Sequence, residues 1–173
     1  MCRDLGEAVN AHGDTLGEEM ATLDATLMAE EDSLWRELQT AMDSFTPEQA
    51  LVPGYFPEGW SAKDALAHIG TWLAEAGVAL EQLRAGTYVE LRTDEIDEMN
   101  ERFLEAMRDA SLHDVKAQAA ASRSRMLHAW QEVPSQQEVA AEWIRKAGPD
   151  HYREHLPRLH EWLQKLQGPS GRA

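Results

Sequence analysis

The sequence predicts an all-α protein, and three observations carry this prediction. Leu, Ala, Met and Glu, which favour helices, are abundant among the 173 residues, whereas the β-branched residues Val and Ile are sparse. Apolar residues recur at intervals of three and four over several long segments, which is the spacing of one helix face. Serine and threonine stand where they can cap the starts of these segments. Together these patterns indicate amphipathic helices that share one core.

The composition also narrows the class of partners. Asp and Glu total 31 against 16 Lys and Arg, which gives a net charge of −15 with histidine neutral. Such a chain repels a phosphate backbone unless its basic residues gather on one face, and here they are scattered along the sequence. No apolar run reaches transmembrane length. We therefore expect a small-molecule partner, no nucleic acid and no membrane.

The chemistry available to a metal site is limited by the single cysteine. Cys2 alone can form neither an internal disulfide nor a thiolate zinc cluster, so imidazole and carboxylate are the plausible metal ligands. The first residues lack the apolar core of a signal peptide. The expected location is the cytoplasm.

The chain is expected to divide into a loose N-terminal arm at residues 1–17, one bundle domain at residues 18–167 and a flexible tail at residues 168–173. The arm has three glycines and few apolar residues, a composition that favours loose or partly helical chain. From residue 18 to residue 45 the apolar spacing predicts a long amphipathic helix. Thr46-Pro-Glu-Gln49 then has the pattern of a capping box and opens one short helical turn.

The second long helix has a distinct start and end. Ser61 can cap it, Asp64 can reach back from three residues later, and Gly86 can adopt the left-handed conformation that closes a helix at Ala85. His68 and Trp72 lie on the flank of its apolar stripe.

Further helices follow from the same signals. Thr93 or Asp94 starts one helix and the capping pattern at Ser111 starts another, and these two segments form either one kinked element or two. A short helix runs to about residue 147, and Gly148-Pro149 separates it from a last helix at about residues 149–167.

Three histidines on two of these helices are candidate metal ligands. His151 and His155 are four residues apart, which stacks their imidazoles on one helix face, and His68 is the best third ligand. His160 falls on the opposite flank of the last helix and should not join the pair. Three neutral imidazoles around zinc or nickel leave a coordination position open, which is typical of a catalytic site. The alternative is that these histidines are hydrogen-bonded core or surface residues.

Two tryptophans are candidate walls of a dry pocket over the metal. Trp72 lies one turn beyond His68, and Trp162 lies about two turns beyond His155. Ordinary packing in the bundle core is the alternative role for each. Asp64 could orient the ring of His68, but its place in the capping box already accounts for it.

Residues Trp60 to Trp72, with Asp64 and His68 between them, resemble the W-S/T-x-x-D-x-x-x-H-x-x-x-W signature of the DinB-like (DinB/YfiT) superfamily. The segment from Phe45 to Gly54 and the segment His151-Tyr-Arg-Glu-His155-Leu are similar to that superfamily as well. The superfamily includes the N-terminal domain of mycothiol-dependent maleylpyruvate isomerases and the colibactin self-protection (ClbS/DfsB) branch.

The resemblance implies a four-helix bundle of up-down-down-up topology with short extra helices in the connections. It also implies a divalent metal, Zn or Ni, on His68, His151 and His155, and a low-molecular-weight thiol as co-substrate. Similarity of residues 94–100 to the ClbS-like branch implies that Tyr55 and Asn100 are pocket residues. The chain ends at the bundle, without the second domain of the isomerases, so the isomerase reaction itself is not implied.

Three functions follow as hypotheses. The first is a metal-dependent enzyme that activates a thiol or water to attack an electrophilic small molecule, as in detoxification. The second is a metal-independent ClbS-like hydrolase, or a self-resistance protein that binds a toxic small molecule. The third is a helical dimerisation module with neither metal nor ligand, so a homodimer stays open.

Overall fold

The computed structural model describes residues 7–55, 59–133 and 138–168, with side chains from residue 24 onwards except that of Thr93. All the regular structure in these residues is helical. In chain order the elements are α1 (Glu7–Asp43), α2 (Pro47–Ala50), α3 (Ala62–Ala85), the 3-10 turn η1 (Thr93–Glu95), α4 (Ile96–Met107), α5 (Leu112–Glu132), α6 (Glu138–Ala147) and α7 (Pro149–Gln167). The predicted all-α fold is confirmed.

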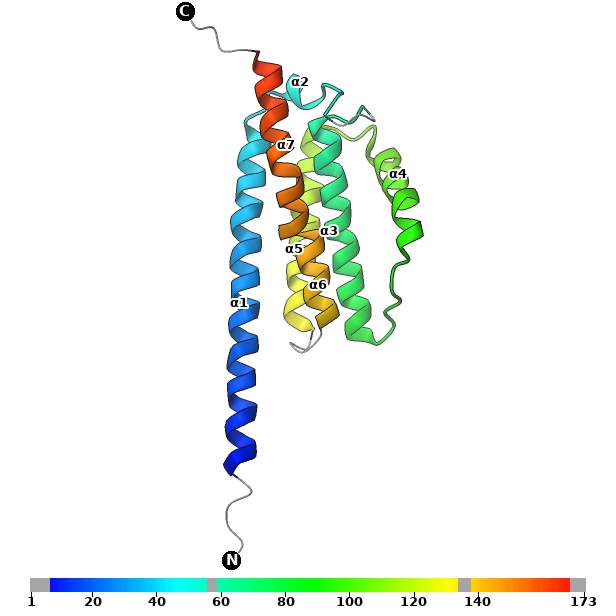
Figure 1. Cartoon of the computed structure of the whole chain (residues 1–173). Helices are drawn as coiled ribbons and strands as arrows, with labels where there is room; N and C mark the ends of the chain where they lie inside the picture. The colour runs from blue at the N-terminus through cyan, green and yellow to red at the C-terminus, as the bar shows by residue number, and fades with distance from the viewer. Residues whose placement is uncertain (1–6, 56–58, 134–137, 169–173) are drawn as a thin grey trace, which may run out of the picture.

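The helices form a four-column bundle (Figure 1). α1 runs up, α3 and α5 both run down, and α6 and α7 follow one another upward as the fourth column. This is the up-down-down-up topology that the resemblance implies. α2 and α4 are the short extra helices, and both lie in connections between columns. None of the helices in the described part of the chain is long and apolar enough to cross a membrane.

The four columns pack as two pairs. α3 lies along α5, α1 lies along α7, and α6 bridges the pairs because it packs on α3 and adjoins α7. The buried core between them is made of aliphatic and aromatic side chains with almost no exposed surface. Its largest fully buried members include Leu38, Met42, Ile69, Leu73, Leu80, Met126, Ile144, Tyr152 and Leu159.

The α3–α5 pair is close because a glycine stands at the crossing point. A Cβ built on Gly70 would lie 2.9 Å from both the Cα and the Cβ of Ala119. No real side chain tolerates that distance to another backbone, so the two helices can approach this closely only with glycine on α3 and a small residue on α5.

The helix caps expected from the sequence are present. At Thr46 and Ser61 the side chain accepts the backbone N–H three residues later, and Gln49 and Asp64 bond back to the capping residues. Gly86 closes α3 with φ of 69°, in the left-handed region. These local signals place α3, and therefore His68, in register with the rest of the bundle.

One element differs from its expected boundary. α1 begins at Glu7, so its helix extends towards the N-terminus well beyond residue 18. Of the two alternatives expected for residues 93–133, the structure has two separate helices, because Ser111 caps a new helix after α4 has ended. The Lys63 ammonium secures the end of α4 by donating to the carbonyl oxygens of Arg108 at 2.7 Å and Ala110 at 3.2 Å. α4 is thereby held outside the four columns against α3.

The structure describes only part of the expected arm at residues 1–17 and of the expected tail at residues 168–173. Residues 1–6 and 169–173 lie outside the described residues, as does Ser135, the expected cap of α6. The division into arm, bundle and tail stays a prediction.

Candidate metal centre

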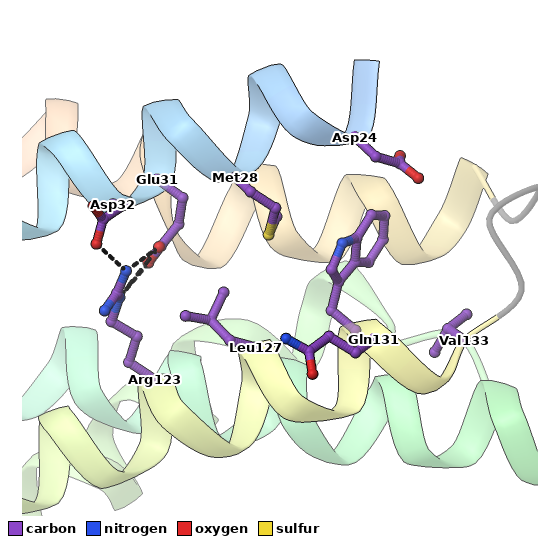
Figure 2. A pocket seen from close by; sticks show the side chains of 9 residues that line it. Asp24, Met28, Glu31, Asp32, Arg123, Leu127, Gln131 and Val133 are labelled. Carbon is purple, nitrogen blue, oxygen red and sulfur yellow. Dashed lines mark hydrogen bonds and ion pairs between the residues drawn. The ribbon is translucent and has the colours of Figure 1, made fainter. Parts of the chain in front are cut away.

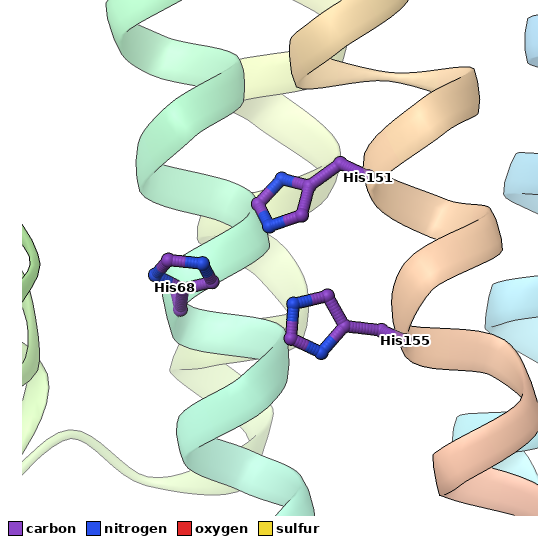
Figure 3. A group of neighbouring side chains, drawn as sticks. All are labelled: His68, His151 and His155. Atoms are coloured by element: carbon purple, nitrogen blue, oxygen red, sulfur yellow. The ribbon is translucent and has the colours of Figure 1, made fainter. Parts of the chain in front are cut away.

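Three imidazoles from two helices meet inside the bundle (Figure 3). His68 comes from α3, and His151 and His155 come from α7. Each offers a ring nitrogen, and these three nitrogens lie within 4.8 Å of one another. The ring centroids are 4.8 Å apart for His68 and His151, 4.9 Å for His151 and His155, and 5.5 Å for His68 and His155. The structure thus brings together the three residues that the sequence singled out.

The sequence puts the pair on α7 close to a helix start. Pro149 occupies the first turn of α7, where its missing N–H costs nothing and its fixed φ suits a helix. A Cβ on Gly148 would lie 2.8 Å from the carbonyl oxygen of Ile144, so glycine lets α6 end and α7 begin within one residue. His151 and His155 consequently lie in the first two turns of α7, midway along the fourth column.

A hydrogen bond at the outer nitrogen orients the His155 ring. The Nδ1 of His155 is 3.0 Å from the hydroxyl oxygen of Tyr55. The backbone of Ala147, one turn earlier, interacts with the His151 ring. In Figure 3 the rings of His151 and His155 each turn one nitrogen towards the centre of the cluster. The Nδ1 of His68 is buried and has no hydrogen-bond partner among the described residues.

Burial keeps all three rings neutral at neutral pH. Burial lowers the pKa of His68 to about 4. Burial, the neighbouring His68 ring and the Arg158 guanidinium lower the pKa of His155 to about 3. Burial and the two other histidines lower the pKa of His151 well below 6.5. Neutral imidazoles with converging free nitrogens are the donor set that zinc or nickel takes, so these residues fit the expected metal.

Aromatic side chains surround the His68 edge of the cluster. The rings of Trp60 and Trp72 lie with centroids 5.2 Å and 6.5 Å from that of His68. Trp72 donates its indole N–H to the amide oxygen of Asn100 at 2.9 Å and packs edge-on against Phe103 at 5.7 Å. Because Asn100 and Phe103 belong to α4, that helix covers this side of the site.

Trp60 and Phe103 were not predicted as neighbours of the site. Trp60 was identified only as the first residue of the DinB-like signature, although an aromatic residue eight positions before a ligand and outside the helix start can fold back over it. The sequence does not show that Phe103 faces Trp72.

Trp162 contacts the loop before α3 and acts on the site through that loop. A Cβ on Gly54 would lie 3.0 Å from the Cη2 atom of Trp162, and the φ of Gly54 is 115°, which only glycine adopts readily. The N–H groups of Gly54 and Tyr55 both donate to the carbonyl oxygen of Trp60, at 2.9 Å and 2.8 Å. Trp162 therefore packs on the turn that carries Tyr55.

The remaining histidines in the described part of the chain lie away from the cluster. His160 is exposed, in agreement with its place on the opposite flank of α7, and His113 and His128 do not join the site either. Helical phase alone was enough to separate His160 from the pair.

A hollow lies between α1 and α5, separate from the histidines (Figure 2). Its volume is about 510 Å³. At one end Arg123 donates two hydrogen bonds to Glu31, at 2.8 Å and 2.5 Å, and a further one to Asp32 at 3.1 Å. None of the predicted site residues lines this groove, which is bounded by Asp24, Met28, Glu31, Asp32, Arg123, Leu127, Trp130, Gln131 and Val133.

Comparisons with known proteins give likeness in structure only. No protein-family model matches the sequence, and no curated protein matches it. Solved structures that match the fold include the following two. A crystal structure of an uncharacterised protein from Escherichia coli UTI89 is 13% identical and has a TM-score of 0.72, covering 83% of this chain and 94% of its own. The colibactin self-resistance protein ClbS, solved in complex with a dsDNA, is 14% identical and has a TM-score of 0.68, covering 84% and 95%.

This chain shares the ClbS fold. The likeness spans nearly the whole of ClbS, so it describes the bundle as one unit and not a fragment of it. It agrees with the similarity of residues 94–100 to the ClbS-like branch. Membership of the wider DinB-like superfamily stays a prediction, because identities of 13% and 14% establish the fold alone.

The ClbS complex corrects one expectation. We expected no nucleic acid partner because the chain carries a net charge of −15. ClbS has been solved with a dsDNA, so a bundle of this fold can hold nucleic acid and the exclusion is wrong. Net charge describes the whole chain, whereas phosphate contacts need only a few donors on one face. The net charge of the chain is therefore not enough to exclude nucleic acid binding.

Proposed function

We propose that the protein is a detoxification-type protein, acting as a metal-dependent enzyme on an electrophilic small molecule. His68, His151 and His155 hold a divalent ion, Zn²⁺ or Ni²⁺, and a low-molecular-weight thiol or water attacks the electrophile. The observation that carries this proposal is the convergence of three neutral imidazoles, one half-buried (His68) and two buried (His151 and His155), whose ring nitrogens lie within 4.8 Å of one another. The shared fold with a self-resistance protein supports the detoxification part.

The donor set suits activation of a nucleophile. A divalent ion on three neutral ligands keeps its full positive charge and lowers the pKa of a thiol or water bound to it. Side chains of the protein orient the ligands and exclude water. Tyr55 holds the donor nitrogen of His155 in place through its contact with the opposite ring atom, and Trp60 and Trp72 exclude water from the His68 side.

The proposal also names a co-substrate and a location. A mycothiol-type thiol is the co-substrate that the resemblance to the isomerase domain implies, and the cytoplasm, where such thiols stay reduced, is the matching compartment. Incubating an electrophile with the protein in the presence and absence of that thiol, and identifying the product by mass spectrometry, distinguishes S-transfer, which adds the thiol sulfur, from hydrolysis, which adds water.

Elemental analysis tests the metal. Protein purified without a His-tag is expected to carry about one Zn or Ni per chain, and His155→Ala to carry almost none, because two imidazoles hold such ions far more weakly than three. His160→Ala is the matched control on the same helix and should keep the metal. Folded wild-type protein without affinity for either ion would contradict the proposal.

A second candidate function is favoured by the fold neighbour. ClbS-like action without a metal, by hydrolysis or by binding of a toxic small molecule, is compatible with the same bundle. Activity with and without the metal distinguishes the two candidate functions. Protein stripped with EDTA should lose its action on an electrophile under the first and keep it under the second, and His68→Ala should give the same pattern.

A further inference from the structure

The rings of the three histidines have different surroundings. The His151 ring interacts with the backbone of Ala147, the last residue of α6. The His68 Nδ1 has no partner among the described residues. The His155 Nδ1 meets a side chain, the hydroxyl of Tyr55, from a residue 100 positions earlier in the chain. Among these contacts, the one at His155 alone can be removed by a conservative substitution.

The Tyr55 hydroxyl has two neighbours on the same residue. Its oxygen lies 3.0 Å from the His155 Nδ1 and 3.2 Å from the His155 carbonyl oxygen. A hydroxyl has one proton to donate, and a carbonyl can only accept. Both bonds form together in one arrangement, in which the hydroxyl donates to the carbonyl oxygen and accepts from Nδ1–H. In the other tautomer the hydroxyl can serve only one of the two neighbours.

The burial of Tyr55 and His155 gives the choice of tautomer an energetic consequence. Tyr55 and His155 are both buried, with 8% and 2% of their surfaces exposed, so water cannot freely replace a missing bond. Burial also raises the pKa of Tyr55 well above its ordinary value, so the hydroxyl keeps its proton. The two rings lie nearly parallel, at 19°, with centroids 6.1 Å apart.

We propose that Tyr55 is a positioning residue for this site, because it holds His155 as the Nδ1–H tautomer with its Nε2 lone pair facing His68 and His151. This inference rests on the proposed function where it concerns metal binding, whereas the tautomer itself is a property of the metal-free protein. Figure 3 agrees with it, since one ring nitrogen of His155 points at the cluster and the other points away.

The turn that carries Tyr55 is built for this contact. Trp162 packs on Gly54, and the carbonyl oxygen of Trp60 accepts the N–H groups of both Gly54 and Tyr55. The hydroxyl therefore reaches α7 from a turn that α7 itself supports through Trp162. The placement of Tyr55 depends on rigid neighbours and not on its own rotamer alone.

The first test is the tautomer in metal-free wild-type protein. Long-range ¹H–¹⁵N correlation spectra at neutral pH distinguish Nδ1–H from Nε2–H for each histidine. We expect His155 as Nδ1–H in the wild type, with a marked rise of the Nε2–H form in Tyr55→Phe. A wild-type His155 in the Nε2–H form overturns the inference, whatever the variant does.

The second test is Zn²⁺ affinity by competition with a chromophoric chelator. Tyr55→Phe should weaken binding by about 10-fold to 100-fold, as loss of a partner behind a ligand does. Tyr152→Phe is the matched control, because that tyrosine is also buried, adjoins His151 and bonds to Glu31 at 3.0 Å, away from the cluster. Its affinity should stay within twofold of the wild type. Equal affinities for Tyr55→Phe and wild type overturn the inference.

The two tests keep this inference apart from the proposed function. Wild-type protein that binds no Zn²⁺ but shows His155 as Nδ1–H, with a shift in Tyr55→Phe, removes the proposed metal and leaves the role of Tyr55 standing. If the wild-type protein binds Zn²⁺ and Tyr55→Phe binds it with the same affinity, the proposed metal site stands and the role of Tyr55 is removed.

Discussion

Glu31 is a buried charge whose environment depends on one arginine. Its side chain has no exposed surface, and Arg123 donates to it from two nitrogens while Tyr152 donates a further hydrogen bond. Arg125, two residues further along α5, also donates from two nitrogens to Glu81, but half of the Arg125 side chain is exposed. The same geometry thus occurs twice on one helix at different burial.

The two arginines should differ in their effect on stability. Arg123→Met leaves Glu31 charged and buried with only one donor, and should lower the free energy of unfolding by about 3–5 kcal/mol. Arg125→Met removes an exposed pair and should cost less than about 1 kcal/mol. Urea unfolding of both variants measures this, and equal losses would show that the Glu31 site is less dry than the structure indicates.

The buried histidines should make the metal-free protein sensitive to acid. Burial lowers the pKa of His68 to about 4, whereas the unfolded chain has an ordinary value near 6.5. The unfolded state therefore binds more protons between these values, so the stability is fully present above pH 6.5 and is lost as the pH falls towards 4.

The size of this effect can be isolated with one substitution. From pH 7.5 to pH 5 the wild type should lose about 2 kcal/mol more than His68→Leu, which has no proton to bind at that position. Urea unfolding at both pH values with EDTA present measures the difference, and His160→Ala, an exposed substitution on α7, should keep the wild-type loss. An identical pH slope in His68→Leu would mean that His68 is solvated.

At the scale of elements, the α3–α5 crossing sets how close two columns can be. Gly70 and Gly77 both lie on α3 and face α5, yet a Cβ on Gly77 would meet its nearest atom, the Met126 nitrogen, at 3.5 Å, which is an ordinary contact. Gly70→Ala should force the helices apart, whereas Gly77→Ala should gain helix propensity. We expect Gly70→Ala to be less stable than Gly77→Ala by about 1–3 kcal/mol in urea unfolding. A Gly70→Ala variant more stable than Gly77→Ala would contradict the close contact at the α3–α5 crossing.

Elements were predictable from the sequence where their signals are local. The caps at Thr46 and Ser61 and the left-handed Gly86 lie within four residues of the helix ends that they determine. The phase of His151, His155 and His160 follows from residue spacing alone. The position of α4 was not predictable in this way, because it depends on where Lys63 and Trp72 of α3 can reach.

At the scale of the whole molecule, the contacts that shape the site join distant positions. The Tyr55 hydroxyl reaches His155 across 100 residues, and Glu31 meets Arg123 across 92. No spacing rule connects such pairs, since their approach depends on how the columns pack. The sequence could therefore predict which histidines form the cluster, but not which residue holds the His155 ring or that a charged groove lies between α1 and α5.

The packing of the four columns as two pairs makes the histidine cluster a cross-link. His68 belongs to the α3–α5 pair, and His151 and His155 belong to the α1–α7 pair. Anything held by all three imidazoles adds its binding free energy to the cohesion of the two halves.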